Sequence, residues 1–441
     1  MSQTDPGYLF LLLPCAAALY YCCPVSRRTE AFCLLSAVLF VFLQPVHAVW
    51  MLPSILFDAL TSFFICRRGR KSYLSKTFLL LSVVKDVSLL LIFGILRPLF
   101  GAGGAPACLL VSHSCALAAL LLQKKGGVRF SSPLLFCGYT LFAGHLSLGP
   151  IADPARVVNS IKKPECSFQK VGQGAFLVVF GVMKRALLSE QLFALYKTLL
   201  RLTAEQMSVG AAWMTALCPA LGLFFVFSAY SDIAVGTGLL FGVELPRMTY
   251  YPLQACGARE AVYHLNMPLQ DLLGRLFSPF YQRENGSRLS FAVSLLSPFA
   301  LAVLLAPGVG TLFWAAWLSA ACALDCFLTV PKRRSRAIIL RLLTFLCLLP
   351  SYALLGQIPS ESIGTLGAML GLGGLPLTND VLLYLILSNG AVLAVSVLLS
   401  TSLLSSAQRN LHRRFPAVWW LCSAAVCIPV LIITTSFIIR M

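Results

Sequence analysis

Long apolar runs separated by short polar segments are the main pattern of this chain. A helix needs about 20 apolar residues to cross the hydrocarbon core of a bilayer, and shorter runs suit helices that stop part-way. The runs that approach this length cover 8–23, 32–44, 46–66, 77–96, 107–122, 130–148, 174–188, 207–243, 291–306, 312–330, 338–355, 381–403 and 417–439. The run at 207–243 is long enough for two shorter pieces. The pattern predicts an all-α polytopic membrane protein with roughly a dozen spans, some of them short or re-entrant.

The composition agrees with this pattern. Of the 441 residues, 58% are hydrophobic and only 11% are charged, whereas a soluble domain carries about 25% charged residues. We therefore expect residues 1–441 to form a single integral-membrane domain. We interpret the first run as a span and not as a signal peptide, because a signal peptide begins with basic residues and the only charged residue before this run is Asp5.

Basic residues mark every second loop in the first third of the chain. They lie at 27–28, 67–76 and 124–129, whereas the loops near 44–46 and 98–106 hold no lysine or arginine. Because lysine and arginine concentrate in cytoplasmic loops, we expect a multi-pass protein of the cell membrane with its N-terminus outside. The net charge of +18 then reflects topology, and we expect no nucleic-acid partner.

The 16 cysteines do not form a recognisable framework. Most lie inside apolar runs, and no two are spaced as C-x-x-C, so metal-binding or redox spacing is absent. Cysteine in such surroundings behaves as a small buried hydrophobic residue. We expect no metal site and no tightly bound cofactor.

Two polar, proline-bearing segments interrupt the apolar pattern, at 150–173 and 245–290. Irregular backbone at membrane depth survives only where protein covers it or where it lines a water-filled cavity. These segments predict a central funnel or tunnel, with interfacial loops as the alternative. Ionisable residues inside apolar runs are functional candidates, because charge is costly in a membrane. They are Asp58, Lys85, Asp86, His113, His145, Lys184, Arg185, Asp232 and Asp325.

The densest group of polar residues lies at 227–276. Here an apolar helix with several polar side chains is followed by a proline turn and an amphipathic stretch. Polar groups in a span followed by a polar segment describe a buried site, and a solvated loop is the alternative. The candidate residues are Tyr230, Ser231, Asp232, Glu260, His264 and Asn266.

This segment resembles the core signature of the membrane-bound O-acyltransferase family, in the bacterial branch that serves alginate O-acetylation and teichoic-acid D-alanylation. The family pattern runs F-S-G-Y-S-D-M-A-I-G, then L-F-G, then a Y-P segment that leads to W-H-x-S-L. The matching residues are Phe227, Ser228, Tyr230, Ser231, Asp232, Ala234, Gly236, Leu240, Phe241, Gly242, Pro246, Tyr251, Pro252, Glu260 and Leu269. The resemblance covers about residues 8–330.

The resemblance implies acyl transfer. In the family, a cytoplasmic thioester donor, either an acyl-CoA or an acyl-carrier protein, delivers an acyl group through a tunnel. The acceptor is a hydroxyl of a cell-surface polysaccharide or of a secreted or membrane-anchored relay partner. A base must take the hydroxyl proton, and histidine suits this task because its pKa lies near neutrality. The resemblance makes Asn266 and His264 the catalytic candidates and Tyr230, Ser231, Asp232 and Glu260 the substrate-binding candidates.

The chain departs from the family pattern at the histidines. Asn266 stands where the family has the histidine of its W-H motif, and the segment 295–325, where the catalytic histidine is expected, contains none. His264 lies two residues from the motif position, which is about 200° on a regular helix. It therefore replaces the missing base only through a local shift of register. Asp232 and Glu260 are alternative bases if burial raises the pKa of their carboxyl groups.

Two other functions fit the same sequence. A degenerate family member would keep the fold and bind lipid or a partner protein as a scaffold without turnover. A transporter would use the central cavity, with Lys85, Asp86, Lys184 and Arg185 as charges along its pathway. Solute flux in proteoliposomes without an acyl donor distinguishes transport from the other two.

Overall fold

The computed structural model describes most of the chain. The described residues are 3–69, 71–96, 107–146, 148–277, 286–305, 308–325, 334–355, 359–402, 414, 425, 427–436 and 438. Within them the regular structure is helical and no strand occurs. His412 and most of the first half of the expected span at 417–439 lie outside the described residues.

Helices follow one another with short connections along the described chain. Up to residue 206 they are η1 (Tyr8–Leu12), α1 (Leu13–Cys22), η2 (Val25–Arg27), α2 (Arg28–Leu43), α3 (Pro45–Arg68), α4 (Tyr73–Leu91), η3 (Ile92–Leu96), α6 (Ala107–Lys125), α7 (Pro133–Thr140), α8 (Pro154–Lys162), α9 (Phe168–Met183), η4 (Lys184–Ser189), α10 (Glu190–Leu199) and η5 (Ala204–Gln206). The later helices are α11 (Val209–Leu240), η6 (Pro252–Gln254), α12 (Ala258–Leu265), α13 (Met267–Phe277), α14 (Gly286–Leu304), α15 (Val309–Leu324), α16 (Arg334–Leu348), η10 (Leu349–Leu354), α17 (Pro359–Met369), α18 (Asp380–Ser388) and α19 (Gly390–Leu399).

Several of these helices match membrane spans. Among the described residues, five are long and apolar enough to cross a bilayer, and they lie at Pro45–Arg68, Tyr73–Leu96, Ala107–Lys125, Phe168–Leu199 and Val209–Leu240. The pair α18 and α19, bent by 65°, adds a sixth if it is one span, and five shorter apolar helices accompany them. The protein is a helical membrane protein, as the apolar pattern predicts. Fewer helices reach full length than the dozen spans expected.

Two of the expected spans differ in the structure. The run at 207–243 is one helix of 32 residues, α11, and not two pieces. The run at 130–148 contains only the short helix α7, followed by turns. Its Phe136, Tyr139 and Phe142 are buried by other helices, so this run is apolar because protein surrounds it and not because it crosses lipid.

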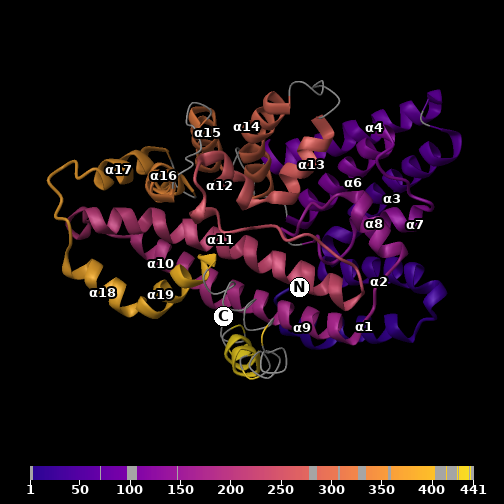
Figure 1. Ribbon diagram of the computed structural model, residues 1–441, viewed down its shortest axis with the longest axis horizontal. Coiled ribbons are helices and arrows are strands. Elements are labelled where there is room, and N and C mark those ends of the chain that lie inside the picture. The colour runs from indigo at the N-terminus through magenta and orange to yellow at the C-terminus, as the bar shows by residue number, and fades with distance from the viewer. Residues whose placement is uncertain are drawn as a thin grey trace.

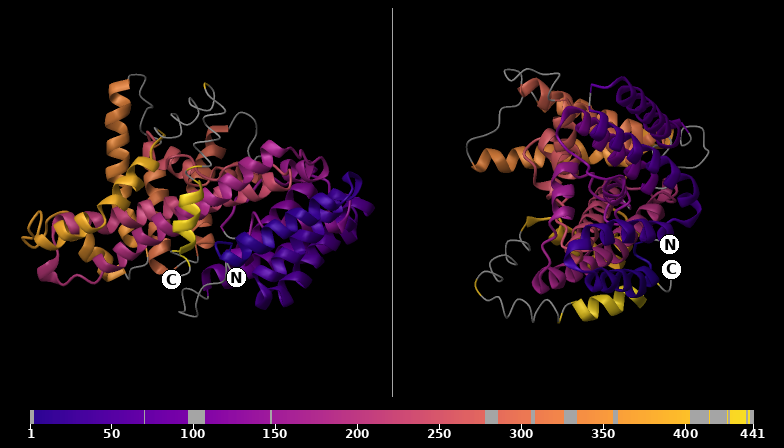
Figure 2. Two further views of the ribbon diagram at one scale, coloured as in Figure 1. Left: turned by 90° about the horizontal axis from the view of Figure 1, so that it is seen from below. Right: turned by 90° about the vertical axis from the view of Figure 1, so that its right-hand side faces the viewer.

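The N-terminal helices form a bundle at one end of the molecule (Figure 1). Within it α3 packs against α4, α6 and α7, and α2 packs against α7. The views in Figure 2 show this bundle on one side of the long central helices, with α16–α19 toward the opposite end.

The centre of the molecule is the pair α9 and α11, which lie side by side (Figure 1). Glycines allow their backbones to touch: a Cβ added at Gly236 would lie 2.6 Å from the carbonyl oxygen of Gly174, and one at Gly181 would lie 2.7 Å from that of Ala229. Small residues at such positions let membrane helices pack closely. The pair therefore forms a fixed support for the side chains that both helices carry.

Candidate functional site

A pocket of about 110 Å³ lies beside the α9 and α11 pair, under the chain segment that follows α11. Its polar lining residues are Lys184, Ser228, Ser231, Asp232, Arg247 and Thr249. Its aromatic lining residues are Phe176, Phe180, Phe224, Tyr250 and Tyr251. Leu177 of α9, Leu399 at the end of α19 and Thr401 just beyond it complete the wall. A concave site with apolar walls and a few convergent polar groups is the usual form of a ligand pocket.

A buried ion pair lies at the centre of this lining. The Nζ atom of Lys184 lies 2.5 Å from Oδ2 of Asp232 and donates to Oγ of Ser228 at 2.8 Å. Ser228 and Asp232 are four residues apart and so lie on the same face of α11. The Lys184 and Asp232 side chains are only 13% and 9% exposed. The sequence places Lys184 at the point where α9 passes into the π-helix η4, an irregularity that is common at functional sites.

The segment after α11 is held over the pocket by backbone hydrogen bonds. Oγ of Ser231 accepts from the Met248 backbone N–H at 2.8 Å, and the Tyr250 N–H donates to the His264 carbonyl at 2.9 Å. Tyr251, which lines the pocket, has the left-handed conformation with φ of 36°. Such a backbone is costly for a bulky residue and is often found at functional sites. The signature residue Ser231 thus positions the part of the wall that carries Tyr250 and Tyr251.

The structure brings only two of the six predicted site residues into the pocket lining, Ser231 and Asp232. Tyr230, their neighbour on α11, is half-buried and is not part of the lining. Glu260 is exposed, and its carboxylate accepts a hydrogen bond from the Cys256 N–H at 2.7 Å, at the start of α12. Glu260 therefore ties α12 to the turn that precedes it.

Asn266 and His264 lie close together in sequence but in different surroundings. Asn266 is 2% exposed and is the N-cap of α13, where its Oδ1 accepts from the Leu269 N–H at 3.2 Å. The His264 ring packs edge-to-face against the ring of Tyr250, with 5.3 Å between ring centroids. His264 is therefore the predicted catalytic residue that contacts the pocket wall.

Burial adjusts the protonation of His264. Desolvation lowers the pKa of the imidazole below its usual value, and Glu260 one turn earlier offsets part of this effect. Its Nδ1 atom is buried and has no hydrogen-bond partner within the described residues. The imidazole is therefore neutral at neutral pH, which is the form in which histidine accepts a proton.

Sequence analysis did not identify several of the residues that line the pocket. Arg247, Thr249 and Tyr250 lie in a segment that sequence alone describes only as polar, and Leu399 and Thr401 carry no signal because they reach the pocket from the far end of the chain. Lys184 and Ser228 had a signal, as a charge inside an apolar run and as a signature residue. Across the described residues, no three histidine, cysteine or acidic side chains are placed to hold a metal ion.

Comparison with known proteins gives the site its context. No protein-family model matches the chain. A peptidoglycan O-acetyltransferase from Helicobacter pylori is 28% identical over 136 residues, which cover 28% of this chain and 25% of that protein. A probable alginate O-acetylase from Azotobacter vinelandii is 25% identical over 262 residues, which cover 53% of this chain and 50% of that protein. The chain is thus similar to bacterial O-acetylating proteins over part of its length.

The relationship extends over part of each protein. A probable alginate O-acetylase from Pseudomonas aeruginosa is 29% identical over 107 residues, 24% of this chain and 20% of that protein. The chain thus covers half or less of the length of each of these relatives. The resemblance stated from the signature at 227–276 is confirmed.

Proposed function

We propose that this chain is a membrane O-acyltransferase, which moves an acetyl or similar acyl group from a thioester donor to a hydroxyl of a cell-envelope polysaccharide. One observation carries the proposal. Four of the signature residues, Ser228, Ser231, Asp232 and Tyr251, line the pocket. Three of the six polar lining residues therefore belong to the signature that resembles the O-acyltransferase family.

The charges of the pocket favour a donor that carries phosphate. Asp232 balances Lys184, and the exposed Arg247 adds a second positive charge to the lining. Arginine and lysine are the side chains that bind phosphate groups most strongly. Acyl-CoA and the prosthetic arm of an acyl-carrier protein both carry phosphate at one end of a pantetheine arm and the thioester at the other end. The aromatic wall suits the apolar part of either donor.

We assign the proton transfer to His264. Its neutral imidazole contacts Tyr250 in the pocket wall, whereas the side-chain oxygen of Asn266 is engaged as a helix cap. Proton transfer by a positioned base contributes about 10²- to 10⁴-fold to a rate. Asn266 then acts as a positioning residue, because it fixes the start of α13 directly after His264. Tyr230 and Glu260 stay predictions as substrate-binding residues.

The topology that we infer follows from the basic loops at 27–28, 67–76 and 124–129. These loops face the cytoplasm, where thioester donors are made, and the N-terminus lies outside. The pocket then belongs to a funnel through which the acyl group passes to an acceptor, either a polysaccharide or a relay partner. The shorter apolar helices that accompany the five long ones support a total near a dozen spans.

Acyl transfer by purified protein in proteoliposomes tests this proposal. Acetyl-CoA is the donor probe, oligosaccharides of peptidoglycan and of alginate are the acceptor probes, and released CoA thiol and acetylated sugar are measured together. We expect both products from the wild type, a fall of about 100-fold or more in His264→Gln, and unchanged rates in Asp271→Asn, a matched substitution of an exposed carboxylate.

Each result separates the competing functions. Equal rates in His264→Gln, Asn266→Ala and the wild type would contradict a catalytic role for this segment. If neither acetyl-CoA nor an acetylated carrier protein supports any transfer by folded wild-type protein, the chain is a non-catalytic relative that binds lipid or a partner. Solute flux above that of protein-free vesicles without a donor would instead identify a transporter.

A further inference from the structure

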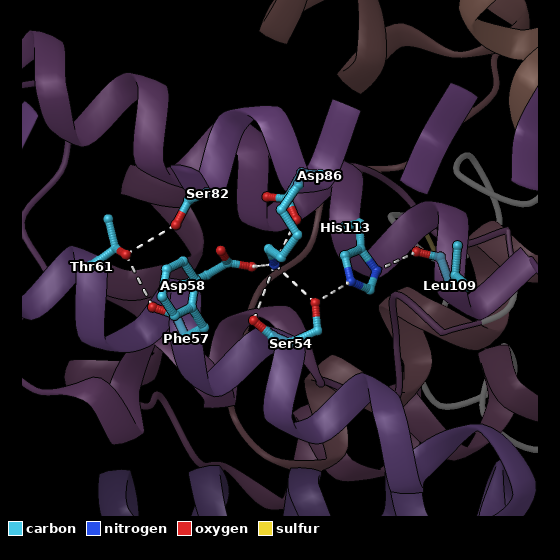
Figure 3. Close-up of polar contacts among 9 residues, drawn as sticks. Ser54, Phe57, Asp58, Thr61, Ser82, Asp86, Leu109 and His113 are labelled. Carbon is cyan, nitrogen blue, oxygen red and sulfur yellow. Dashed lines mark hydrogen bonds and ion pairs between the residues drawn. The ribbon is translucent and has the colours of Figure 1, made fainter. Parts of the chain in front are cut away.

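A second group of ionisable side chains lies in the N-terminal bundle, apart from the pocket. The Nζ atom of Lys85 lies 2.6 Å from Oδ2 of Asp58 and 2.8 Å from Oδ1 of Asp86. The same nitrogen donates to Oγ of Ser54 at 2.8 Å, and Ser54 Oγ lies 3.0 Å from Nε2 of His113. Figure 3 shows Ser54, Asp58, Asp86 and His113 converging from α3, α4 and α6.

These groups are inside protein within membrane-spanning helices. Asp58, Asp86 and His113 are 0% exposed, while the Lys85 side chain is 25% exposed. The only fully buried residues of α4 are polar, namely Ser75, Ser82 and Asp86, whereas Leu80 and Val84 of the same helix are exposed. α4 therefore directs its apolar side chains outward and its polar side chains into the bundle, and intramembrane ionisable residues of this kind are typically functional.

The charges of this cluster do not balance if every group has its usual form. Two carboxylates face one ammonium, and the described neighbours add no further cation. Nδ1 of His113 lies 3.0 Å from the Leu109 carbonyl oxygen and must donate to it. In the neutral ring, the ordinary form of histidine at neutral pH, Nε2 then accepts from the Ser54 hydroxyl at 3.0 Å. Cys137 of α7 faces Asp58, and a thiol is uncharged at neutral pH.

An unbalanced negative charge in a buried site is removed by binding a proton, because the solvation cost of an isolated ion exceeds that of neutralisation. The atoms for such a proton are present. Oδ1 of Asp58 and Oδ2 of Asp86 are buried and accept no hydrogen bond from a described donor. Both carboxyl groups contact the same ammonium, so a proton on either one leaves the cluster neutral.

We propose that Asp58, Lys85 and Asp86 form an intramembrane proton-binding site that holds one proton on the carboxyl pair, and that Ser54 and His113 extend it as a proton relay. In the relay step the Ser54 hydroxyl gives its proton to Nε2 of His113 and takes one from the Lys85 ammonium. Lys85 is then reprotonated by the carboxylic acid. The outcome is two carboxylates, one ammonium and one imidazolium, which is again neutral.

The two resting places of the proton therefore carry the same total charge. This equality means that the cluster gains no net charge when the proton moves, so the added imidazolium is compensated by the added carboxylate. The partly exposed Lys85 is the route by which the proton exchanges with the outside of the bundle.

Infrared spectroscopy of the purified full-length protein in a maltoside detergent, which has no ester carbonyl, tests the site directly. A protonated carboxyl group gives a C=O stretching band that shifts in D2O, and a carboxylate does not. We expect this band in the wild type at neutral pH. It should disappear in Asp58→Asn and also in Asp86→Asn, because each variant leaves one carboxylate paired with Lys85, and it should persist in Asp271→Asn.

Two further variants test the charge balance and the relay. Lys85→Met leaves two unpaired carboxyl groups and should raise the band about twofold. In the wild type the proton is shared between the carboxyl pair and His113, so the intensity of the band should change with temperature. His113→Gln removes the second resting place, confines the proton to the carboxyl pair and should leave the intensity constant. Absence of the D2O-sensitive band from the wild type, which requires no variant to fold, would overturn the site. Identical temperature dependence in wild type and His113→Gln would overturn the relay.

Discussion

Breaking the ion pair between Lys184 and Asp232 is the perturbation with the largest expected effect on stability in the pocket. Lys184→Met keeps most of the length of the side chain and removes the ammonium that lies 2.5 Å from Asp232 and 2.8 Å from Ser228. Loss of one partner from a buried pair costs about 3–5 kcal/mol, because the other charge stays buried without compensation. Since both side chains keep slight exposure, at 13% and 9%, we expect the lower end, about 3 kcal/mol.

A double-mutant cycle measures this pair. The free energy of unfolding is obtained by denaturant titration of detergent-solubilised wild type, Lys184→Met, Asp232→Asn and the double variant. The double variant has no stranded charge, so we expect it to recover at least about 1 kcal/mol relative to Lys184→Met. If the two single losses simply add in the double variant, the atoms do not interact in the folded protein and the pocket geometry is wrong.

Three other predictions concern the helix contact, the cap and the base. Gly236→Ala should lower the free energy of unfolding by about 1–3 kcal/mol, because its Cβ would meet the Gly174 carbonyl oxygen at 2.6 Å in a packed contact. The control Gly274→Ala, where nothing lies within 4 Å, should cost nothing. Equal losses in the two variants would contradict the contact. Asn266→Ala should lose about 1 kcal/mol in the same titration, whereas Asn266→Asp keeps the capping oxygen and should lose less. The rate of acyl transfer should fall at low pH through protonation of His264, with its midpoint below the usual histidine pKa, because burial lowers the pKa of this imidazole. A midpoint above the usual histidine pKa would exclude His264 as the base.

The apolar pattern predicted the helical membrane fold because length and hydropathy are local properties. It located α3, α4, α6 and α11 closely, since each is bounded by charged or turn residues. It gave a span for 130–148 because an apolar run buried by protein has the same composition as one that faces lipid. Only the neighbours of α7, such as Cys33 of α2 against Gly138, distinguish the two.

The sequence predicted the part of the site that a single helix supplies. Ser231 and Asp232 share α11 with the signature that draws attention to them. Asn266 has a polar side chain for which a helix cap is an equally good use, and its position in the sequence does not separate a cap from a substrate contact. Glu260 bonds to the backbone of the turn before α12, a contact that no sequence pattern indicates. Thr401 lies 169 residues beyond Asp232 in the sequence numbering, and no local pattern relates two such positions.

The backbone contact between α9 and α11 also determines how the pocket can change size. Gly174 and Gly236 already touch through main-chain atoms, so these two helices cannot approach further and carry their side chains as one rigid wall. A bulkier acyl group must be accommodated on the opposite side, by the segment around Tyr250 or by the end of α19 at Leu399. For the proposed acyl transfer, the width of the acyl group is then set by these two parts of the wall and not by the α9 and α11 pair.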